Sequence, residues 1–340
     1  MKKSVLIIGV SGQDGSILAK KLLNEGLNVL GTTRSISKFN SWRLKDLEIS
    51  EKVKVVEHKL FDKNQLERIF NEAKIDYFFS FASKSGTKAS FEDMLDTYNT
   101  NTISVATQLD VLSKLRVCPI SFFANSSEIY AGSASSCIDE NETVSPLNPY
   151  GASKAANKML IDIYRETFQL PIYTGILFPH DSKYKNSGFV LQTIANGLVR
   201  TLKQNATPIE VGNLETKRDI SDAKIIVPII WDLVQSGNPG NYVIGSGFTS
   251  SIEECVEFFF RFMGEGGFIK QKQGESKTLY FGKKSNVLYL ISNNEDFKAS
   301  NHSYGPANIS KIINLLAQFP KSNLEKICEE IYTHSEANAI

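Results

Sequence analysis

The chain has 340 residues, of which 41% are hydrophobic and 22% charged, and its formal net charge is +1. This composition is typical of a globular protein of one or two domains, and the near-neutral charge gives no electrostatic support for a nucleic-acid partner. No apolar run approaches the roughly 18 residues of a membrane span, and the four cysteines lack metal-binding spacing, so we expect a cytoplasmic protein with reduced thiols, no membrane partner and no metal.

Short apolar runs alternate with helix-like segments through the first half of the chain. Helices are predicted at 16–26 and 63–74, between runs that are typical of buried strands. The predicted strands are 4–10, 27–33, 52–58, 75–82, 118–124 and 171–178. Near-continuous apolar strands separated by helices predict an α/β fold with a doubly wound, parallel Rossmann sheet.

The alternation loosens after about residue 180. The segments predicted here are loops at 183–188, 212–219 and 264–268 and helices at 251–264 and 322–335. We therefore expect residues 1–178 to form the Rossmann domain with the catalytic residues. Residues 179–340 are expected to form mainly a smaller substrate-binding lobe, with some segments returning to the sheet.

A glycine-rich turn, GVSGQDG (9–15), follows the first predicted strand and precedes the first helix. Glycines at 9, 12 and 15 let the backbone turn tightly and approach a pyrophosphate, which the N-terminus of the helix then attracts. In this position the motif favours dinucleotide binding. The alternative is a tight turn that binds no ligand.

The residues that follow the second predicted strand bear on the choice of cofactor. An NAD-specific site usually has an acidic residue here, whereas an arginine suits the 2′-phosphate of NADP. The chain has Arg34 and Ser35, with Arg43 nearby. These residues favour NADP(H), with NAD(H) as the alternative, unless they are simply solvated loop residues.

Tyr150 and Lys154 are four residues apart in the stretch NPYGASK (148–154). On a helix this spacing places both side chains on one face. A nearby ammonium group favours the phenolate and so lowers the tyrosine pKa. The tyrosine could then exchange a proton with a sugar hydroxyl while a hydride moves to or from a nicotinamide. The alternative is a surface pair.

Polar residues follow the fifth predicted strand, where ligands bind in open α/β folds. Ser126 and Ser127 are placed to bond the hydroxyl that Tyr150 deprotonates. Glu128 is not needed for alcohol oxidation, but it could act as a general base on a carbon next to a ketone, which adds an elimination to the redox step. In the alternative reading, Ser126 caps a helix and Glu128 is solvated.

These motifs resemble the extended short-chain dehydrogenases/reductases and, among them, the GDP-mannose 4,6-dehydratase family. The similar segments are GVSGQDGSILAKKLL (9–23), RSISKFNSWRL (34–44), FASKSGTKASF (81–91), SSEIY (126–130), PYGASKA (149–155), TGILFPHDS (174–182) and GNLETKRDISDAK (212–224). The resemblance covers roughly residues 4–260.

The resemblance implies an intramolecular redox cycle. Tyr150 would take the proton of the sugar C4 hydroxyl, with Lys154 keeping it acidic and holding the nicotinamide ribose. Ser126, where the family usually has threonine, would bond the C4 oxygen. Glu128 would remove the C5 proton and assist loss of the C6 hydroxyl as water. Hydride return to C6 gives a 4-keto-6-deoxy sugar, and Arg218 would contact the substrate diphosphate.

The cofactor site is expected to comprise Gly9, Ser11, Gly12, Gln13, Asp14, Gly15, Arg34, Ser35, Arg43, Leu60, Phe81, Ala82, Ser83, Tyr150, Lys154 and His180. The nucleotide-sugar site is expected to comprise Ser85, Ser126, Ser127, Glu128, Asn213, Lys217 and Arg218. The resemblance also implies that the 34–44 loop touches a neighbouring subunit, so we expect a homo-oligomer, either a dimer or a tetramer.

The chain departs from the family pattern at several places. Pro179 stands where the family has asparagine, and Lys59 replaces an aspartate that meets the adenine. The segment 280–306 replaces an Arg-Pro-x-Glu-Val-Asp stretch that clamps the nucleotide ribose. These changes leave the cofactor chemistry in place and leave the nucleotide and the sugar open, with a GDP-heptose among the candidates.

Two other functions remain open from the sequence. A nucleotide-sugar 4-reductase, dehydrogenase or epimerase would use the same fold and stop at C4. A reductase would consume NADPH one for one, whereas a dehydratase needs only catalytic amounts of NADP⁺. A non-catalytic dinucleotide-binding protein would explain the altered C-terminal region, but it gives no physical reason to retain Ser126, Glu128, Tyr150 and Lys154 together.

Overall fold

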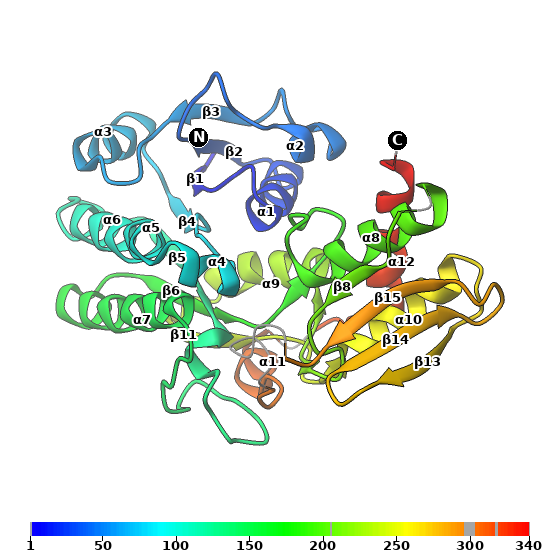
Figure 1. Ribbon diagram of the computed structural model, residues 1–340. Coiled ribbons are helices and arrows are strands. Elements are labelled where there is room, and N and C mark those ends of the chain that lie inside the picture. The colour runs from blue at the N-terminus through cyan, green and yellow to red at the C-terminus, as the bar shows by residue number, and fades with distance from the viewer. Residues whose placement is uncertain (1, 205, 296–302, 317–318, 340) are drawn as a thin grey trace.

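Seven parallel strands form the central sheet of the computed structural model, which describes residues 2–204, 206–295, 303–316 and 319–339 (Figure 1). The spatial order is β11-β6-β5-β4-β1-β2-β3. The strands are β1 (Ser4–Ile8), β2 (Asn28–Thr33), β3 (Lys54–Glu57), β4 (Tyr77–Ser80), β5 (Ile120–Ser126), β6 (Ile172–Leu177) and β11 (Gly240–Ile244). The predicted doubly wound α/β fold is confirmed.

The predicted strands are all present, with ends that differ by a few residues. β1 stops before Gly9, whose positive φ of 93° turns the chain away from the sheet. β5 continues to Ser126, beyond the predicted end at residue 124. β11, which pairs with β6 at one edge of the sheet, was not predicted, although returning segments were expected from this half of the chain.

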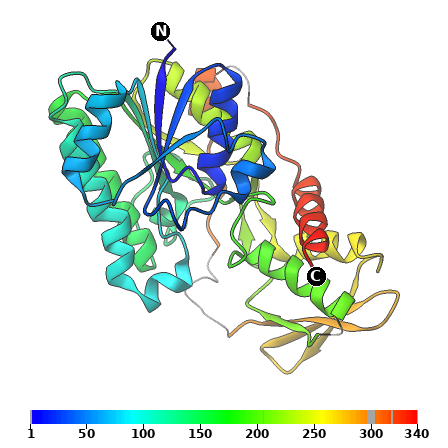
Figure 2. The ribbon, with the colours of Figure 1, turned by 90° about the horizontal axis from the view of Figure 1, so that it is seen from above.

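Helices cover both faces of the sheet (Figure 2). One face packs against α1 (Gln13–Asn24) and α9 (Ala223–Gln235), and it receives Val5 and Ile7 of β1. The opposite face receives Leu6 and Ile8. It packs against α3 (Lys63–Ala73), α6 (Ser104–Leu112) and α7 (Pro149–Phe168). This two-residue alternation shows why both faces of a buried parallel strand must be apolar.

A smaller lobe has its own apolar core. Its sheet has the order β13-β14-β15-β8, and its helices lie against one another and that sheet. The elements are β8 (Ile209–Val211), β13 (Phe268–Gln273), β14 (Lys277–Gly282), β15 (Leu288–Asn293), α8 (Val190–Gln204), α10 (Ile252–Phe262) and α12 (Leu324–Ala337). The helices predicted at 251–264 and 322–335 correspond to α10 and α12. The predicted loop 264–268 differs at its end, where β13 begins.

Two short strand pairs connect the lobes. β7 (His180–Asp181) pairs with β10 (Ser221–Asp222), and β9 (Lys217–Arg218) pairs with β12 (Ser250–Ser251). The segment 212–219, which was predicted as a loop, contains β9. Two residues of extended backbone there pair with β12 and therefore form a short strand. Residues 183–188 form a loop as predicted.

After the small lobe's sheet, the chain returns to the large lobe. Ala307 forms an isolated bridge with Ile138, and α11 (Ser310–Leu316) then packs beside β11. The chain goes back to the small lobe to form α12. Among the described residues, no helix combines the length and apolarity that crossing a membrane requires.

Candidate active site

The glycine-rich turn lies between β1 and α1, at the carboxyl end of the sheet. A Cβ on Gly9 would lie 2.9 Å from the backbone nitrogen of Ala82, and one on Gly15 would lie 2.3 Å from the Gly9 carbonyl oxygen. Gly12 is the N-cap of α1 and has no side chain to bond the first-turn N–H groups. These groups and the helix dipole can therefore bind a pyrophosphate, so the turn fits a dinucleotide.

The strand order reverses beside this turn. β1 pairs with β4 on one side and with β2 on the other, and such a switch point is where open α/β sheets bind ligands. Phe81, the first residue after β4, donates its N–H to the carbonyl of Ile8 at 2.9 Å. Phe81, Ala82 and Ser83 therefore leave the sheet next to the glycine turn, and half-buried Leu60 follows β3.

Three predicted cofactor contacts, Gln13, Asp14 and His180, bond to one another. His180 Nε2 lies 3.0 Å from Asp14 Oδ1, and Gln13 Nε2 donates to the His180 carbonyl at 3.2 Å. Ser182 Oγ donates to Gln13 Oε1 at 2.9 Å. Burial opposes ionisation of Asp14, but His180 and, less strongly, Lys185 hold the pKa of its carboxyl below the ordinary value. This group braces the glycine turn against β7.

The three residues predicted to select NADP have different surroundings. Arg34 is exposed just after β2, and half-buried Ser35 lies next to it. Arg43, on the short helix α2 (Trp42–Asp46), is 7% exposed. Its guanidinium donates to the carbonyl oxygens of Ser11 at 3.0 Å and of Tyr184 at 2.6 Å. Arg43 thus joins the glycine turn to the 183–188 loop. Of the two arginines, Arg34 is the one with an exposed side chain.

A buried asparagine, not predicted from the sequence, organises the other side of the site. Asn101 lies on a π-helical turn (Asn99–Ile103) that precedes α6. Its Oδ1 accepts from Ser83 Oγ at 3.0 Å and from the backbone N–H of Lys84 at 2.8 Å. Its Nδ2 donates to Ser153 Oγ on α7 at 3.0 Å. Asn101 therefore fixes the strand β4 exit relative to the helix that carries Tyr150.

The predicted Tyr150 and Lys154 pair lies on the first turns of α7. Asn148 caps this helix, because its Oδ1 accepts the N–H of Gly151 at 2.7 Å. Lys154 Nζ lies 5.9 Å from the centre of the Tyr150 ring and donates to the Ala124 carbonyl oxygen at 2.9 Å. Both side chains are buried and share one face of the helix, as the spacing predicted.

Burial dominates the ionisation of this pair in the protein alone. Burial raises the pKa of Tyr150 to about 12, a shift that the Glu128 charge reinforces and that a hydrogen bond with Ser126 opposes. Burial lowers the pKa of Lys154 to about 8, against the attraction of Asp14. The expected lowering of the tyrosine pKa by Lys154 is therefore not seen here. A cationic nicotinamide beside the phenol would favour the phenolate.

Ser126, Glu128 and Tyr150 converge at the carboxyl end of β5. Ser126 opposes the rise in the pKa of Tyr150, and its Oγ accepts the N–H of Glu128 at 3.2 Å, capping the 3₁₀ turn Ser127–Tyr130. The capping interpretation of Ser126 is thus confirmed, and its active-site role stays a prediction. Asn148 Nδ2 donates to Glu128 Oε2 at 2.8 Å, so the residue that caps α7 also holds this carboxylate.

A second residue at this carboxylate, Tyr304, was not predicted from the sequence. Its hydroxyl lies 2.8 Å from Ser127 Oγ and 3.4 Å from Glu128 Oε1. Tyr304 belongs to the segment 280–306, which drew attention only because it departs from the family pattern. No local motif marks it, because its contact depends on the return of the chain from the small lobe.

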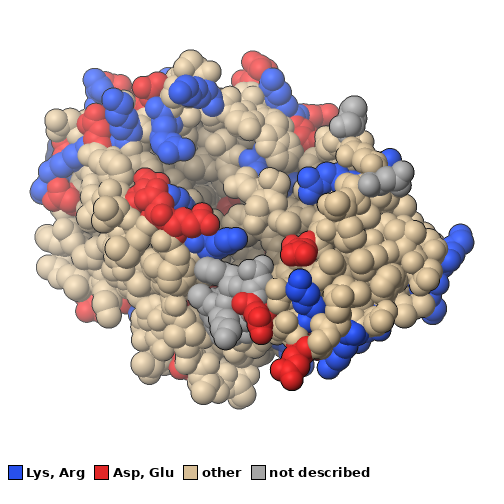
Figure 3. Space-filling view, viewed as in Figure 1, with Lys and Arg blue, Asp and Glu red and all other residues tan. Residues whose placement is uncertain are grey.

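The predicted substrate contacts approach from β9. The Arg218 guanidinium lies 5.4 Å from the centre of the Tyr304 ring, which places it beside the carboxylate group. Lys217 is exposed on the same strand, Asn213 accepts the N–H of Glu215 within its own loop, and Ser85 is exposed after β4. Figure 3 shows a hollow on this face of the molecule, with both basic and acidic side chains at its rim.

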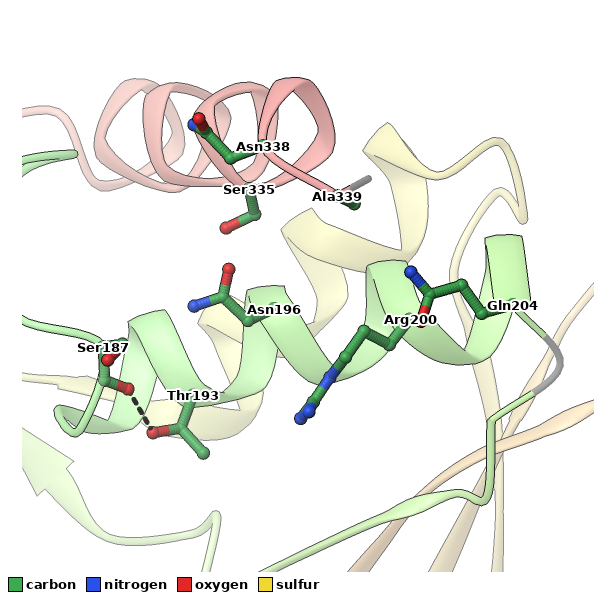
Figure 4. Close-up of a pocket in the computed structure, with 8 residues that line it drawn as sticks. All are labelled: Ser187, Thr193, Asn196, Arg200, Gln204, Ser335, Asn338 and Ala339. Atoms are coloured by element: carbon green, nitrogen blue, oxygen red, sulfur yellow. Dashed lines mark hydrogen bonds between the residues drawn. The ribbon is translucent and has the colours of Figure 1, made fainter.

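A separate polar groove lies between α8 and α12 (Figure 4). Asn196 and Ser335 point toward one another across it, and Arg200 extends from α8. The groove shares no residue with the catalytic set, so it adds nothing to the site at β5.

The fold and this site define the class of protein. The structure resembles UDP-glucose 4-epimerase from Thermotoga maritima, with a TM-score of 0.82, 16% identity, and coverage of 99% of this chain and 100% of the other. It also resembles UDP-glucuronic acid 4-epimerase from Bacillus cereus, with a TM-score of 0.80, 18% identity, and coverage of 98% and 99%. The fold is thus shared with these nucleotide-sugar epimerases.

Sequence comparison identifies the family within this class. The family described as GDP-mannose 4,6 dehydratase matches residues 6–331. The GDP-mannose 4,6 dehydratase of Cricetulus griseus is 32% identical over 275 residues, which are 78% of this chain and 73% of that protein. The Homo sapiens protein is 32% identical over 271 residues, 76% and 72% of the two chains. The chain belongs to the GDP-mannose 4,6-dehydratase family, a family of nucleotide-sugar 4,6-dehydratases, as the sequence motifs had indicated.

Proposed function

We propose that this protein is an NADP-dependent 4,6-dehydratase that acts on a GDP-linked sugar, GDP-mannose or a related GDP-hexose or GDP-heptose. The observation that carries the proposal is the convergence of Ser126, Tyr150 and Glu128. Ser126 Oγ accepts the N–H of Glu128 at 3.2 Å, and Asn148, which caps the helix that carries Tyr150, donates to the Glu128 carboxylate at 2.8 Å. A redox pair alone needs no carboxylate. A carboxylate beside it supplies the base for an elimination.

The first step is oxidation at C4 of the sugar. Tyr150 takes the proton of the C4 hydroxyl as phenolate, and Ser126 donates a hydrogen bond to the same oxygen. Lys154 is expected to bond the nicotinamide ribose, and a cationic nicotinamide beside Tyr150 favours its phenolate. When bound, a nicotinamide would supply the acceptor for the C4 hydride and the donor for its return to C6, and the glycine turn and Lys154 would hold it.

The second step is the loss of water across C5 and C6. The C4 ketone acidifies the C5 proton, which Glu128 removes. The electron pair of the C5–H bond forms the C5–C6 double bond while the C6–O bond breaks, and the departing hydroxyl takes the proton from Glu128. Hydride addition at C6, and transfer to C5 of the proton that Tyr150 took from the C4 hydroxyl, complete the 4-keto-6-deoxy sugar. The balance is the loss of one water and no net use of cofactor.

The cofactor and the nucleotide are proposed from separate features. Exposed Arg34 after β2 supports a 2′-phosphate and therefore NADP(H). The names of the relatives support a GDP-linked sugar. Arg218, beside the Tyr304 ring, supports a contact with the substrate diphosphate, because a guanidinium binds phosphate oxygens in pairs.

We also propose that the chain forms a homo-oligomer. The surface of α5 (Met94–Tyr98) and α7 exposes large apolar side chains: Leu95 is 72% exposed, Met159 59% and Ile163 57%. α5 and α7 pack side by side, so these side chains belong to one region of the surface. Sedimentation equilibrium, with Ile163→Lys as the variant, tests this: wild type should be a dimer or tetramer, and a monomeric wild type would reject it.

A turnover experiment tests the proposed reaction. The protein is incubated with GDP-mannose and NADP⁺ at a small fraction of the sugar concentration, and the products are weighed by mass spectrometry. A dehydratase forms many equivalents of a product lighter by one water. A 4-reductase would instead consume NADPH one for one, and an epimerase would give a product of unchanged mass. Parallel GDP-, CDP-, UDP- and dTDP-sugars test the choice of nucleotide.

A further inference from the structure

The segment that carries Tyr304 is fixed to the large lobe at several points. Ile138 donates its N–H to the Pro306 carbonyl at 2.9 Å and accepts the N–H of Asn308 at 2.7 Å. The N–H of Ala307 donates to the buried carboxylate of Asp219 at 3.0 Å. These bonds hold the backbone on the C-terminal side of Tyr304 in register with the rest of the site.

Packing also fixes the Tyr304 ring. The side chain is 7% exposed and lies edge-on to Phe178, with ring centres 6.0 Å apart. Gly305, the next residue, packs closely against the backbone of Ser135, since a Cβ on it would lie 2.6 Å from the Ser135 carbonyl oxygen. The hydroxyl of a tyrosine held in this way has one position, which is next to Ser127 and Glu128.

Two donors from distant parts of the chain hold the Glu128 carboxylate. Asn148 bonds Oε2 at 2.8 Å, and the Tyr304 hydroxyl lies 3.4 Å from Oε1. Burial and the charge of Glu128 raise the pKa of Tyr304, so its phenol keeps its proton and acts as a donor. The contact from the Tyr304 hydroxyl to Oε1 is the longer of the two.

We propose that Tyr304 is a positioning residue for the elimination step, orienting the Glu128 carboxylate so that it takes the sugar C5 proton. This inference rests on the proposed dehydratase function. Tyr304 keeps its own proton throughout the cycle: the C5 proton passes to Glu128 and then to the departing C6 hydroxyl. Ser127 Oγ lies 2.8 Å from the Tyr304 hydroxyl, so the contacts run in a chain from Ser127 through Tyr304 and Glu128 to Asn148.

The first test is independent of any substrate. Fluorotyrosine placed at position 304 gives one ¹⁹F resonance, which reports on the charge of its neighbours. In the otherwise native protein this resonance should shift with pH in the range where carboxyl groups titrate. The shift should vanish in Glu128→Gln. A resonance that does not respond to pH in that range, or that still responds in Glu128→Gln, overturns the contact on which the inference rests.

The second test compares two tyrosine variants in turnover of GDP-mannose. Tyr304→Phe should lower kcat roughly 10- to 100-fold, the usual effect of losing one hydrogen bond to a charged group, with KM nearly unchanged. The acidic limb of its kcat profile should move to higher pH, because the carboxylate loses a stabilising donor. Reduced nicotinamide should accumulate on the enzyme, since C4 oxidation does not require Glu128.

Tyr130 supplies the matched control. It lies in the same apolar cluster, is fully buried, and has a hydroxyl with no hydrogen-bond partner among the described residues. Tyr130→Phe should leave the pH profile in place. Unchanged kcat and pH profile in Tyr304→Phe would overturn the inference. If the wild type instead formed no dehydrated product from any sugar, the proposed function would fail, and the fluorine titration would still decide the Tyr304–Glu128 contact.

Discussion

Replacement of Glu128 by glutamine separates the two chemical steps proposed for the site. Glutamine has the same shape, and its amide oxygen can still accept from Asn148, which now bonds Glu128 Oε2 at 2.8 Å. Its amide nitrogen can donate to the Tyr304 hydroxyl, now 3.4 Å from Oε1. Because both contacts can be remade, we expect the free energy of unfolding to change by less than about 1 kcal/mol.

The substitution is expected to lower the rate of the elimination step. A positioned general base contributes about 10²- to 10⁴-fold, which corresponds to roughly 3 to 5 kcal/mol of barrier. Dehydration of GDP-mannose by Glu128→Gln should therefore fall by about that factor. C4 oxidation depends on Tyr150 and Ser126, so it should continue and leave the reduced cofactor bound to the protein.

The assay follows both steps in one reaction. Stopped-flow absorbance records the reduced nicotinamide, and mass spectrometry of quenched samples records the loss of water. Glu72→Gln, an exposed carboxylate on α3, is the matched control and should behave as wild type. Near-normal dehydration in Glu128→Gln would refute the base role. Loss of the redox signal together with dehydration would show that Glu128 acts before the elimination.

Three further predictions concern the cofactor site and the cost of building it. Lys154→Met should raise the free energy of unfolding at neutral pH by up to about 3 kcal/mol while abolishing turnover, because burial lowers the pKa of Lys154 from 10.5 to about 8. Since the unfolded chain binds the extra proton between these values, wild-type stability should rise from about pH 8 to 10.5, and urea titrations should show the advantage of the variant shrinking over the same range. Gly15→Ala should cost roughly 1 to 3 kcal/mol and weaken NADP⁺ binding in calorimetry, because the new Cβ would lie 2.3 Å from the Gly9 carbonyl oxygen, whereas Gly188→Ala, with open space around it, should do neither. Arg34→Ala should reduce the affinity for NADP⁺ about tenfold or more and leave that for NAD⁺ nearly unchanged; equal losses for the two cofactors would contradict the assignment.

The parts of the fold that the sequence predicted well are those set by local pattern. Buried parallel strands such as β1 and β6 are continuous apolar runs, and the glycine turn between β1 and α1 has a spacing that few other structures require. β11 was missed because GNYVI contains glycine and asparagine at its start and becomes a strand only by pairing with β6. Its tertiary contact decides its structure, and its composition does not.

In the site, too, the residues set by local pattern were predicted and those set by tertiary contact were missed. Tyr150 and Lys154 were predicted from helical spacing, and Ser126 and Glu128 from their position after the fifth predicted strand. Asn101 could not be predicted, because its role depends on a π-helical turn that aims it at β4 and α7 together. Asn148 stands in the stretch 148–154, but its bond to Glu128 could not be predicted, because it is set by the three-dimensional approach of β5 and α7. The apparent loss of a family motif in 280–306 concealed Tyr304.

Because the chain passes repeatedly between the lobes, the protein cannot be divided into two independent fragments at a single position. A fragment beginning at residue 179 would contain α9, β11 and α11, whose apolar faces pack in the large lobe against partners that such a fragment lacks. A fragment ending at residue 178 would lack β11 and expose the edge of β6. Swapping the small lobe for that of a relative therefore needs several matched junctions, and specificity is better engineered by single substitutions along β9 and the segment after residue 303.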